Sequence, residues 1–113
     1  MLNSVVLVGR AGNRPDLRYF ESGKVQALFP LAVDRPRRRD AEPVTDWFQI
    51  ELWGRQAEIA SEYVRKGSQV GIEGRLAFHP RPEGADEDQA NPYIAANNLR
   101  LLSAPPAAPE VAR

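Results

Sequence analysis

Apolar and polar residues alternate along several stretches of the chain, a pattern that predicts β-strands. The alternation is clearest in residues 25–34, where one face collects the apolar side chains Val25, Ala27, Phe29, Leu31 and Val33. Phe29, in the middle of this face, is expected to lie in the core. Pro30 has no N–H to donate to the ladder, so we expect this strand to lie at an edge of the sheet or to be bulged there.

A second strand, at residues 47–53, divides its side chains by parity. One face carries Phe48, Ile50 and Leu52, and the other carries Trp47, Gln49, Glu51 and Trp53. Because glutamine and glutamate side chains prefer water, we expect the second face to be solvated and both tryptophans to point away from the core. The two indoles would then lie roughly 20 Å apart along the strand.

Three further strands and one helix complete the predicted fold. The strands are expected at residues 2–8, 68–76 and 93–102, with Val70, Ile72 and Leu76 inward in the second of these. An apolar stripe predicts a helix at residues 55–66, ended by Gly67, and residues 17–19 could continue a bent strand. Five strands with one short helix between the third and the fourth indicate the all-β class and fit a small Greek-key barrel.

One domain is expected, because 113 residues leave room for little else. We place it at residues 1–102 and expect a frayed tail, rich in proline and alanine, at residues 103–113. The chain contains no cysteine, which excludes disulfides and thiolate chemistry. Neither a membrane-spanning run nor a signal peptide is expected, and the simplest location is the cytoplasm.

Charge is unevenly distributed along the chain, although the net charge is zero. Residues 1–81 carry thirteen basic and ten acidic side chains, whereas residues 82–113 carry two and five. A zero net charge counts against a general nucleic-acid binder, whose surface is usually basic. Thirteen of the fifteen basic residues are arginine, which suits phosphate binding and stacking better than lysine does.

A series of short motifs falls in order along residues 2–76. They are LNSVVLVGR at 2–10, PDLRY at 15–19, SGK at 22–24, WFQI at 47–50, WGRQAE at 53–58, YVRKGSQV at 63–70 and IEGRL at 72–76. In these motifs the chain closely resembles the bacterial single-stranded DNA-binding proteins, the SSB family, with a weaker match at 93–102. The resemblance implies a five-stranded OB-fold barrel, a homo-oligomer that is usually a tetramer, association with the nucleoid, and binding of single-stranded DNA with little sequence preference.

The resemblance also implies roles for single residues. Trp47 and Trp53 lie where the family places aromatic residues that stack on bases, and strand parity independently puts them on the solvated face. Arg18, Arg55 and Lys66 align with basic positions that contact the nucleic-acid strand. RNA could be bound as well, because stacking tolerates both. Further basic candidates for phosphate contact are Arg10, Arg35, Arg37, Arg38, Arg75 and Arg81.

Several features favour an alternative, an OB-fold adaptor or accessory protein of the primosome type that acts mainly through protein partners. Many family members carry stacking tryptophans near Arg37 and Arg81, which are arginines here. The loop at 80–92 is acidic at residues 86–88, whereas a hairpin that embraces DNA should be basic. The cluster around Arg35 could be a solvated loop, neutralised in part by acidic neighbours. The short tail lacks the acidic tip with which replicative members recruit other proteins.

No catalytic, metal or cofactor site is predicted, so we expect neither an enzyme nor a small-molecule substrate, and no membrane attachment. His79 is the only histidine and has no partner for a triad or a metal site, so it is expected at the surface. The carboxylates at 86–88 lie on a loop that does not preorganise Mg²⁺ coordination. The remaining aromatic residues Phe78, Tyr19 and Tyr63 are expected to pack in the core or against the helix.

Overall fold

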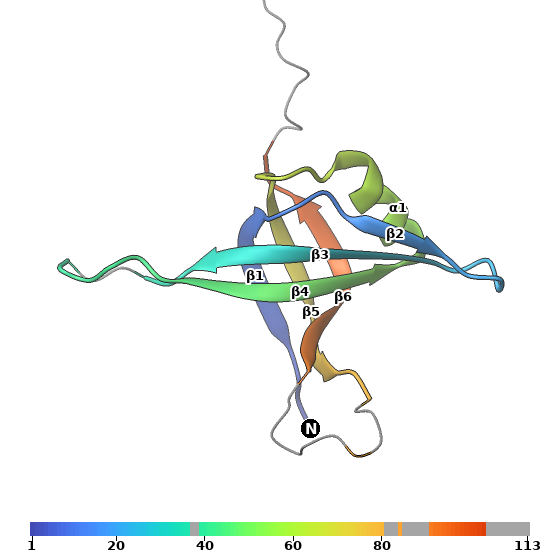
Figure 1. The fold of residues 1–113 in the computed structure, drawn as a ribbon, viewed down its shortest axis with the longest axis horizontal. Coiled ribbons are helices and arrows are strands. Elements are labelled where there is room, and N and C mark those ends of the chain that lie inside the picture. The colour runs from blue at the N-terminus through green and yellow to red at the C-terminus, as the bar shows by residue number, and fades with distance from the viewer. Residues whose placement is uncertain (37–38, 81–83, 85–90, 104–113) are drawn as a thin grey trace, which may run out of the picture.

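Six strands and one helix form the part of the chain that the computed structural model describes, residues 1–36, 39–80, 84 and 91–103 (Figure 1). The helix α1 (Gly54–Tyr63) lies between the fourth and fifth strands. The strands are β1 (Val5–Ala11), β2 (Asp16–Tyr19), β3 (Val25–Asp34), β4 (Thr45–Trp53), β5 (Gln69–Phe78) and β6 (Pro92–Leu101).

These strands form one sheet in the order β1-β5-β6-β4-β3-β2. Because β1 also pairs with β3, five strands close into a barrel, and β2 is attached to the outside of β3. The predicted all-β class and OB-type barrel are therefore confirmed. Residues 16–19 form a strand of their own, paired with β3, rather than a continuation of the first strand.

Pro30 lies where β3 changes its partner. β2 pairs with β3 up to Leu28, and β1 pairs with it from Leu31 onward. In the gap between them, the Pro30 carbonyl accepts a hydrogen bond of 2.8 Å from the Gly12 N–H. The N–H and C=O of a strand residue point to the same side, so the missing donor of Pro30 faces this gap. The prediction of an edge strand was wrong, because β3 is interior and the gap accommodates the proline.

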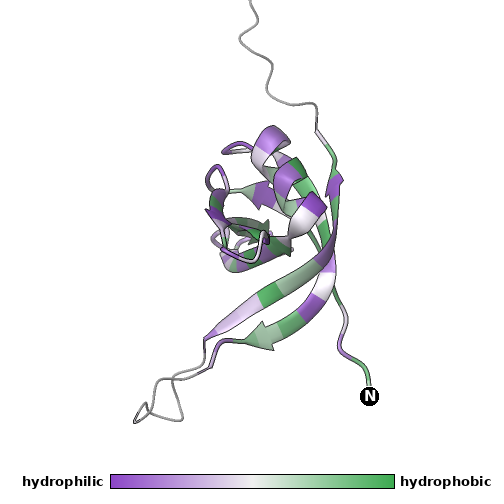
Figure 2. Cartoon of the chain, turned by 90° about the vertical axis from the view of Figure 1, so that its right-hand side faces the viewer, coloured by the Kyte–Doolittle hydropathy of each residue, from purple (hydrophilic) through white to green (hydrophobic). Residues whose placement is uncertain are grey.

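The core is a continuous apolar cluster filled from β1, β3, β4, β5, β6 and α1. Phe29 is 1% exposed, as predicted, and Ile50 and Leu52 of β4 are fully buried beside it. Fully burying a side chain of this size stabilises a fold by about 1.5–3 kcal/mol. Apolar and polar bands are both seen along the strands (Figure 2), and more and less exposed residues alternate along β1 and the first part of β4, as a sheet with one covered face requires.

Helix α1 ends before the predicted residue. The N–H of Val64 donates to the carbonyl of Ala60 at 2.9 Å, after which the chain becomes extended and the Val64 side chain enters the core. Gly67 therefore does not terminate the helix. It has a φ of 90°, in the left-handed region that glycine adopts readily, and its N–H donates to the carbonyl of Ala11 at 2.7 Å. This turn fixes the start of β5 to the end of β1.

The pairing of β5 with β6 shifts register midway along the strands. Glu73 faces Asn98 but Gly74 faces Ala96, so β6 contains one extra residue at this point. Beyond the shift Leu76 and Phe78 are exposed, and their predicted burial was wrong. Tyr19 and Tyr63 are exposed as well, contrary to their predicted packing.

The chain remains attached to the barrel beyond β6. The Leu102 N–H donates to the carbonyl of Gln69 at 3.0 Å, and the Ser103 hydroxyl accepts from the Gln69 N–H at 2.9 Å. The rest of the predicted tail and the acidic residues 86–88 lie outside the described residues. Where the chain is described, it contains no helix that is both long enough and apolar enough to cross a bilayer.

Candidate nucleic-acid interface

Trp47 and Trp53 are both exposed on the same face of β4. Trp47 is 59% and Trp53 42% exposed, as strand parity predicts. Side chains at odd positions of this strand share one face, so both indoles belong to the surface opposite the core. The two rings are surrounded by different side chains and lie in two separate hollows.

Glu51 holds the N–H edge of the Trp53 indole. The indole Nε1–H donates to Glu51 Oε1 at 3.0 Å, and Gln26 Nε2 donates to Glu51 Oε2 at 2.8 Å. Glu51 is only 7% exposed, because these two neighbours lie over it. The prediction that Glu51 is solvated was therefore wrong. The ring of Phe20 lies 5.6 Å from the Trp53 ring, at an interplanar angle of 36°.

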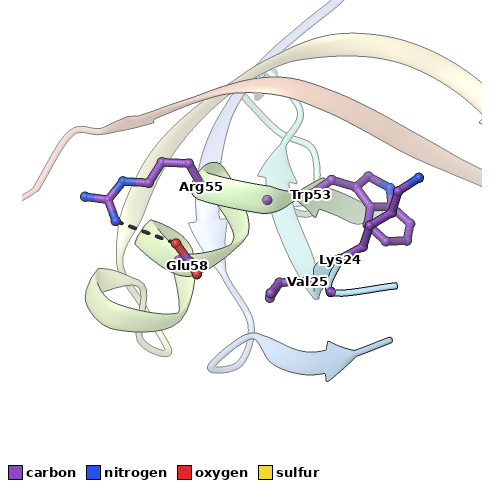
Figure 3. A pocket seen from close by; sticks show the side chains of 7 residues that line it. Lys24, Val25, Trp53, Arg55 and Glu58 are labelled. Atoms are coloured by element: carbon purple, nitrogen blue, oxygen red, sulfur yellow. Dashed lines mark ion pairs between the residues drawn. The ribbon is translucent and has the colours of Figure 1, made fainter. Parts of the chain in front are cut away.

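The hollow at Trp53 has a volume of about 600 Å³ and lies between the β2–β3 turn and the start of α1. Lys24 lies on the Trp53 side of this hollow, and Arg55 and Glu58 come from α1 (Figure 3). Arg55 Nη1 is 3.6 Å from Glu58 Oε1, so its charge is partly compensated. Arg18 of β2 belongs to the same region, because it lies opposite Gln26, which in turn lies opposite Trp53. Lys24 and Arg55 therefore line the same hollow as the exposed indole, with Lys24 beside Trp53 and Arg55 on the opposite side, and Arg18 lies two strands away on the same face.

A second, mostly apolar hollow of about 320 Å³ adjoins Trp47. It is lined by Trp47, Phe48, Gln49, Leu76, Phe78, Pro92, Tyr93 and Ile94. Phe78 is 58% exposed here, and the Tyr93 ring stacks on His79 with a centroid distance of 4.1 Å. Phe78 and Tyr93 at this hollow, and Phe20 beside Trp53, were not predicted from the sequence as residues of the interface. The sequence carries no signal for the exposure of Phe78, because this residue has the same strand parity as the buried Val70 and Ile72.

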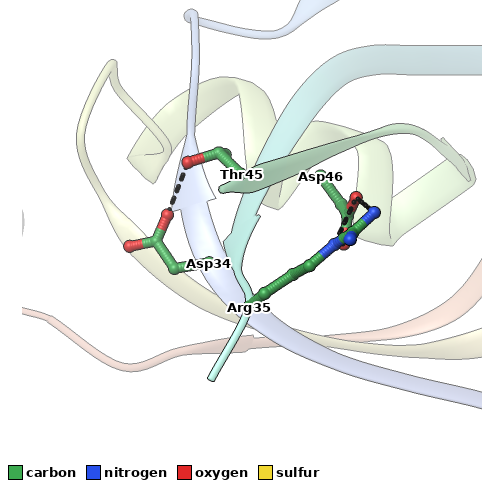
Figure 4. Close-up of polar contacts among 4 residues, drawn as sticks. All are labelled: Asp34, Arg35, Thr45 and Asp46. Carbon is green, nitrogen blue, oxygen red and sulfur yellow. Dashed lines mark hydrogen bonds and ion pairs between the residues drawn. The ribbon is translucent and has the colours of Figure 1, made fainter. Parts of the chain in front are cut away.

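Arg35 is engaged within the protein rather than directed at a ligand site. Its Nε and Nη2 donate to the two carboxylate oxygens of Asp46, each at 3.0 Å (Figure 4). This pairing lowers the pKa of Asp46 and raises that of Arg35, chiefly through the side-chain hydrogen bonds. Beside it, the Thr45 hydroxyl donates to Asp34 Oδ1 at 2.8 Å. The two contacts fasten the ends of β3 and β4 together.

The other predicted basic residues do not gather at the tryptophans. Arg10 Nη1 donates to the carbonyl of Gly67 at 3.1 Å, at the end of β1, and Lys66 is exposed in the same turn. Arg75 is exposed on β5, beyond the register shift. Arg37, Arg38 and Arg81 lie outside the described residues. Among the described residues, no group of three or more histidine or carboxylate side chains is arranged to hold a metal ion.

Comparison with known proteins places these features in context. Residues 2–102 match the model of the Single-strand binding protein family. Single-stranded DNA-binding protein 1 of Synechocystis sp. is 49% identical over 102 residues, covering 89% of this chain and 84% of that protein. The single-stranded DNA-binding protein of Thermosynechococcus vestitus is 45% identical over 103 residues, covering 90% and 83%. That of Treponema pallidum is 38% identical, covering 89% and 58%. The similarity thus extends from β1 to the end of β6.

Proposed function

Because this chain belongs to the single-strand binding protein family, we propose that it binds single-stranded DNA without strong sequence preference, on the face formed by β2, β3 and β4. The observation that carries this proposal is the exposure of Trp47 and Trp53 on one face of β4. Stacking of a base on an exposed aromatic ring contributes about 1–3 kcal/mol and is tolerant of sequence. Members of this family are binding proteins, so the chain is not an enzyme, as its sequence predicts.

The two indoles would engage different nucleotides of one strand. They are six positions apart along β4, which corresponds to roughly 20 Å. This separation is too large for the rings to sandwich a single base. In the hollow at Trp47, Phe78 and Tyr93 offer further aromatic surface close to the position of the second base.

Phosphate contacts would come mainly from the basic residues around Trp53. Arg18, Lys24 and Arg55 lie near this ring, and a backbone that follows a base stacked on Trp53 would pass within their reach. Arg35 would contribute less, because its Nε and Nη2 are bound to Asp46. We retain as further phosphate contacts Arg10, Arg37, Arg38, Lys66, Arg75 and Arg81.

Self-assembly, expected as a tetramer, is supported by the outer side of β1. This strand pairs with β5 from Val5 to Arg10, but with β3 only at Arg10 and Ala11. Within the described residues, the other edge of its first half therefore has no strand partner. Val6 is 68% and Val8 51% exposed on this strand. A second copy would pair with the open edge and cover these two side chains.

Titration of the wild-type protein with a dT oligomer tests the central proposal. Stacking on Trp47 and Trp53 should quench the intrinsic tryptophan fluorescence, and duplex DNA of the same length should quench it far less. Competition with an rU oligomer would show whether RNA is also bound. A folded protein that neither quenches nor binds would contradict the proposal and favour the adaptor function. Binding of this kind would serve replication, recombination or repair in the cytoplasm, where DNA becomes single-stranded.

A further inference from the structure

Glu51 is unusual because it is a charged side chain in a buried place. Among the described residues it is the only charged side chain that is buried, at 7% exposure. Removing a carboxylate from water is costly unless it is paired and hydrogen-bonded. Within the same part of the chain, Glu51 forms no ion pair. A specific role must therefore be sought in the groups that it does contact.

Both contacts of Glu51 lead to the proposed binding face. Its Oε1 accepts from the Trp53 indole Nε1–H at 3.0 Å, and its Oε2 accepts from Gln26 Nε2 at 2.8 Å. Gln26 and Trp53 are direct partners across the β3–β4 ladder, so the three side chains form a closed group on one face. Hydrogen bonds to an ionised acceptor are stronger than those between neutral groups.

These contacts restrict the Trp53 ring without covering it. The N–H edge is held by Glu51, and Phe20 lies against the ring at 5.6 Å. The indole nevertheless remains 42% exposed, and it lines the hollow that also holds Lys24 and Arg55. A side chain that is ordered before binding loses less conformational entropy when a ligand stacks on it.

We propose that Glu51 is a positioning residue, which holds the Trp53 indole in the orientation that stacks on a base. The proposal rests on the proposed function, since it concerns the affinity for single-stranded DNA. It also explains why an acid occupies this site. A leucine of similar volume would avoid the desolvation of a carboxylate but would leave the Gln26 amide and the Trp53 N–H without their acceptor.

The test compares Glu51→Leu with Glu51→Gln. Glutamine keeps an acceptor for the indole through its amide oxygen, and the amide of Gln26 can turn to accept from it. Glu62→Leu makes the same chemical change at an exposed carboxylate near the end of α1 and is the matched control. Glu51→Met, which also lacks an acceptor, serves as a second variant in case leucine disturbs the packing.

Three quantities are measured for each variant. They are the position of the Trp53 indole N–H signal in a ¹H–¹⁵N spectrum, the melting temperature, and the affinity for a dT oligomer. The chain has two tryptophans, so the spectrum of Trp47→Phe assigns both indole signals. In Glu51→Leu we expect the Trp53 signal to move, the Trp47 signal to stay, and the affinity to fall about three- to tenfold. The melting temperature should fall as well, because the buried Gln26 amide loses its acceptor. Glu51→Gln should restore the affinity to within about twofold, and Glu62→Leu should change none of the three quantities.

Two results would overturn the positioning role. One is a Trp53 signal that stays in place in both Glu51→Leu and Glu51→Met. The other is a displaced signal with wild-type affinity. A failure of the proposed function would look different, because the wild-type protein itself would then not bind the dT oligomer. That result would overturn both proposals.

Discussion

Gly12 and the ring of Trp47 are packed so closely that a Cβ added to Gly12 would lie 2.6 Å from Cζ3 of the indole. The same Cβ would lie 3.2 Å from Cγ of Pro30. Trp47 thus rests against the backbone at the end of β1, at the position where β3 changes its partner. A different interaction holds each of the two exposed indoles. Trp47 is held by close packing and Trp53 by a hydrogen bond.

Gly12→Ala is therefore expected to displace the Trp47 ring. The ring is the outer end of an exposed side chain and can swing aside, so the free energy of unfolding should fall by about 1 kcal/mol or less. The affinity for a dT oligomer should fall, because the ring leaves its stacking position. Tryptophan emission and a binding titration check this together. Gly71→Ala is the control, because a Cβ there makes only ordinary contacts, the nearest at 3.6 Å. Wild-type affinity in Gly12→Ala would contradict the expectation.

Trp47→Ala and Trp53→Ala should each weaken binding of a dT oligomer about 5- to 150-fold, which corresponds to about 1–3 kcal/mol per stacked base. Because the rings are far apart, the two losses in binding free energy should add in the double variant. Tyr63→Ala removes an exposed aromatic ring that lines neither hollow and should bind as the wild type does. The far-UV circular dichroism spectrum of every variant should match that of the wild type. Unchanged affinity in both tryptophan variants would show that the indoles do not stack on bases.

The salt dependence of binding should identify the residues that contact phosphate. Each phosphate neutralised on a single strand contributes about −0.7 to the slope of log affinity against log salt concentration. Lys24→Gln and Arg55→Gln should each make the slope shallower by about this amount. Arg35→Gln should change the slope least, because the Arg35 guanidinium is already bound to Asp46. An affinity that does not depend on salt would exclude phosphate contact altogether.

The Arg35–Asp46 pair should stabilise the fold only above the pH range in which Asp46 takes up a proton. The pKa of Asp46 is lowered from its ordinary 3.8 by the hydrogen bonds from Arg35. Because the pKa of Asp46 is lower in the folded state than in the unfolded state, the contribution of the pair to stability is complete above the unfolded-state pKa. It is lost as the pH falls through the folded-state pKa. Asp46→Asn should thus be less stable than the wild type at neutral pH, by a small amount since the pair is exposed. Denaturant unfolding at several pH values should show this difference vanish in strong acid, and a difference that persists there would contradict the pairing.

Charge placed on the outer side of β1 should prevent assembly. Val6→Asp and Val8→Asp would set carboxylates where we propose that a second copy lies, and burial of an unpaired charge there is unfavourable. Light scattering should report a smaller species for both variants. Val44→Asp makes the same change at an exposed valine outside the strands and should leave the assembly intact. A wild-type protein that is monomeric would exclude the proposed interface.

The alternation of side chains within one strand correctly predicted whether a residue points inward or outward where that strand alone decides its environment. Parity alone placed Trp47 and Trp53 outward and Phe29 inward, because successive side chains alternate between faces. The failures involve relations between strands. Phe78 is exposed although it has the parity of the buried Val70 and Ile72, so nothing covers its end of β5 within the described residues. Pro30 lies in an interior strand because β1 and β2 share one side of β3.

Glu51 shows the same limit at the level of a single side chain. Its parity is that of the tryptophans, as expected, yet it is buried because Gln26 and Trp53 bind over it. No pattern within β4 contains this information, since one of the two partners comes from β3. The hydrogen-bonded group became visible only when the register of the two strands was known.

The position of Pro30 also protects the barrel against strand exchange with other extended chains. Between the last residue paired with β2 and the first paired with β1, the backbone of β3 pairs with no strand, and the Gly12 N–H bonds to the Pro30 carbonyl. A proline at this position has a ring instead of an N–H donor. An extended segment that inserted there could therefore not form a complete set of backbone hydrogen bonds with β3. This gap in the strand pairing is thereby a poor starting point for strand exchange and aggregation.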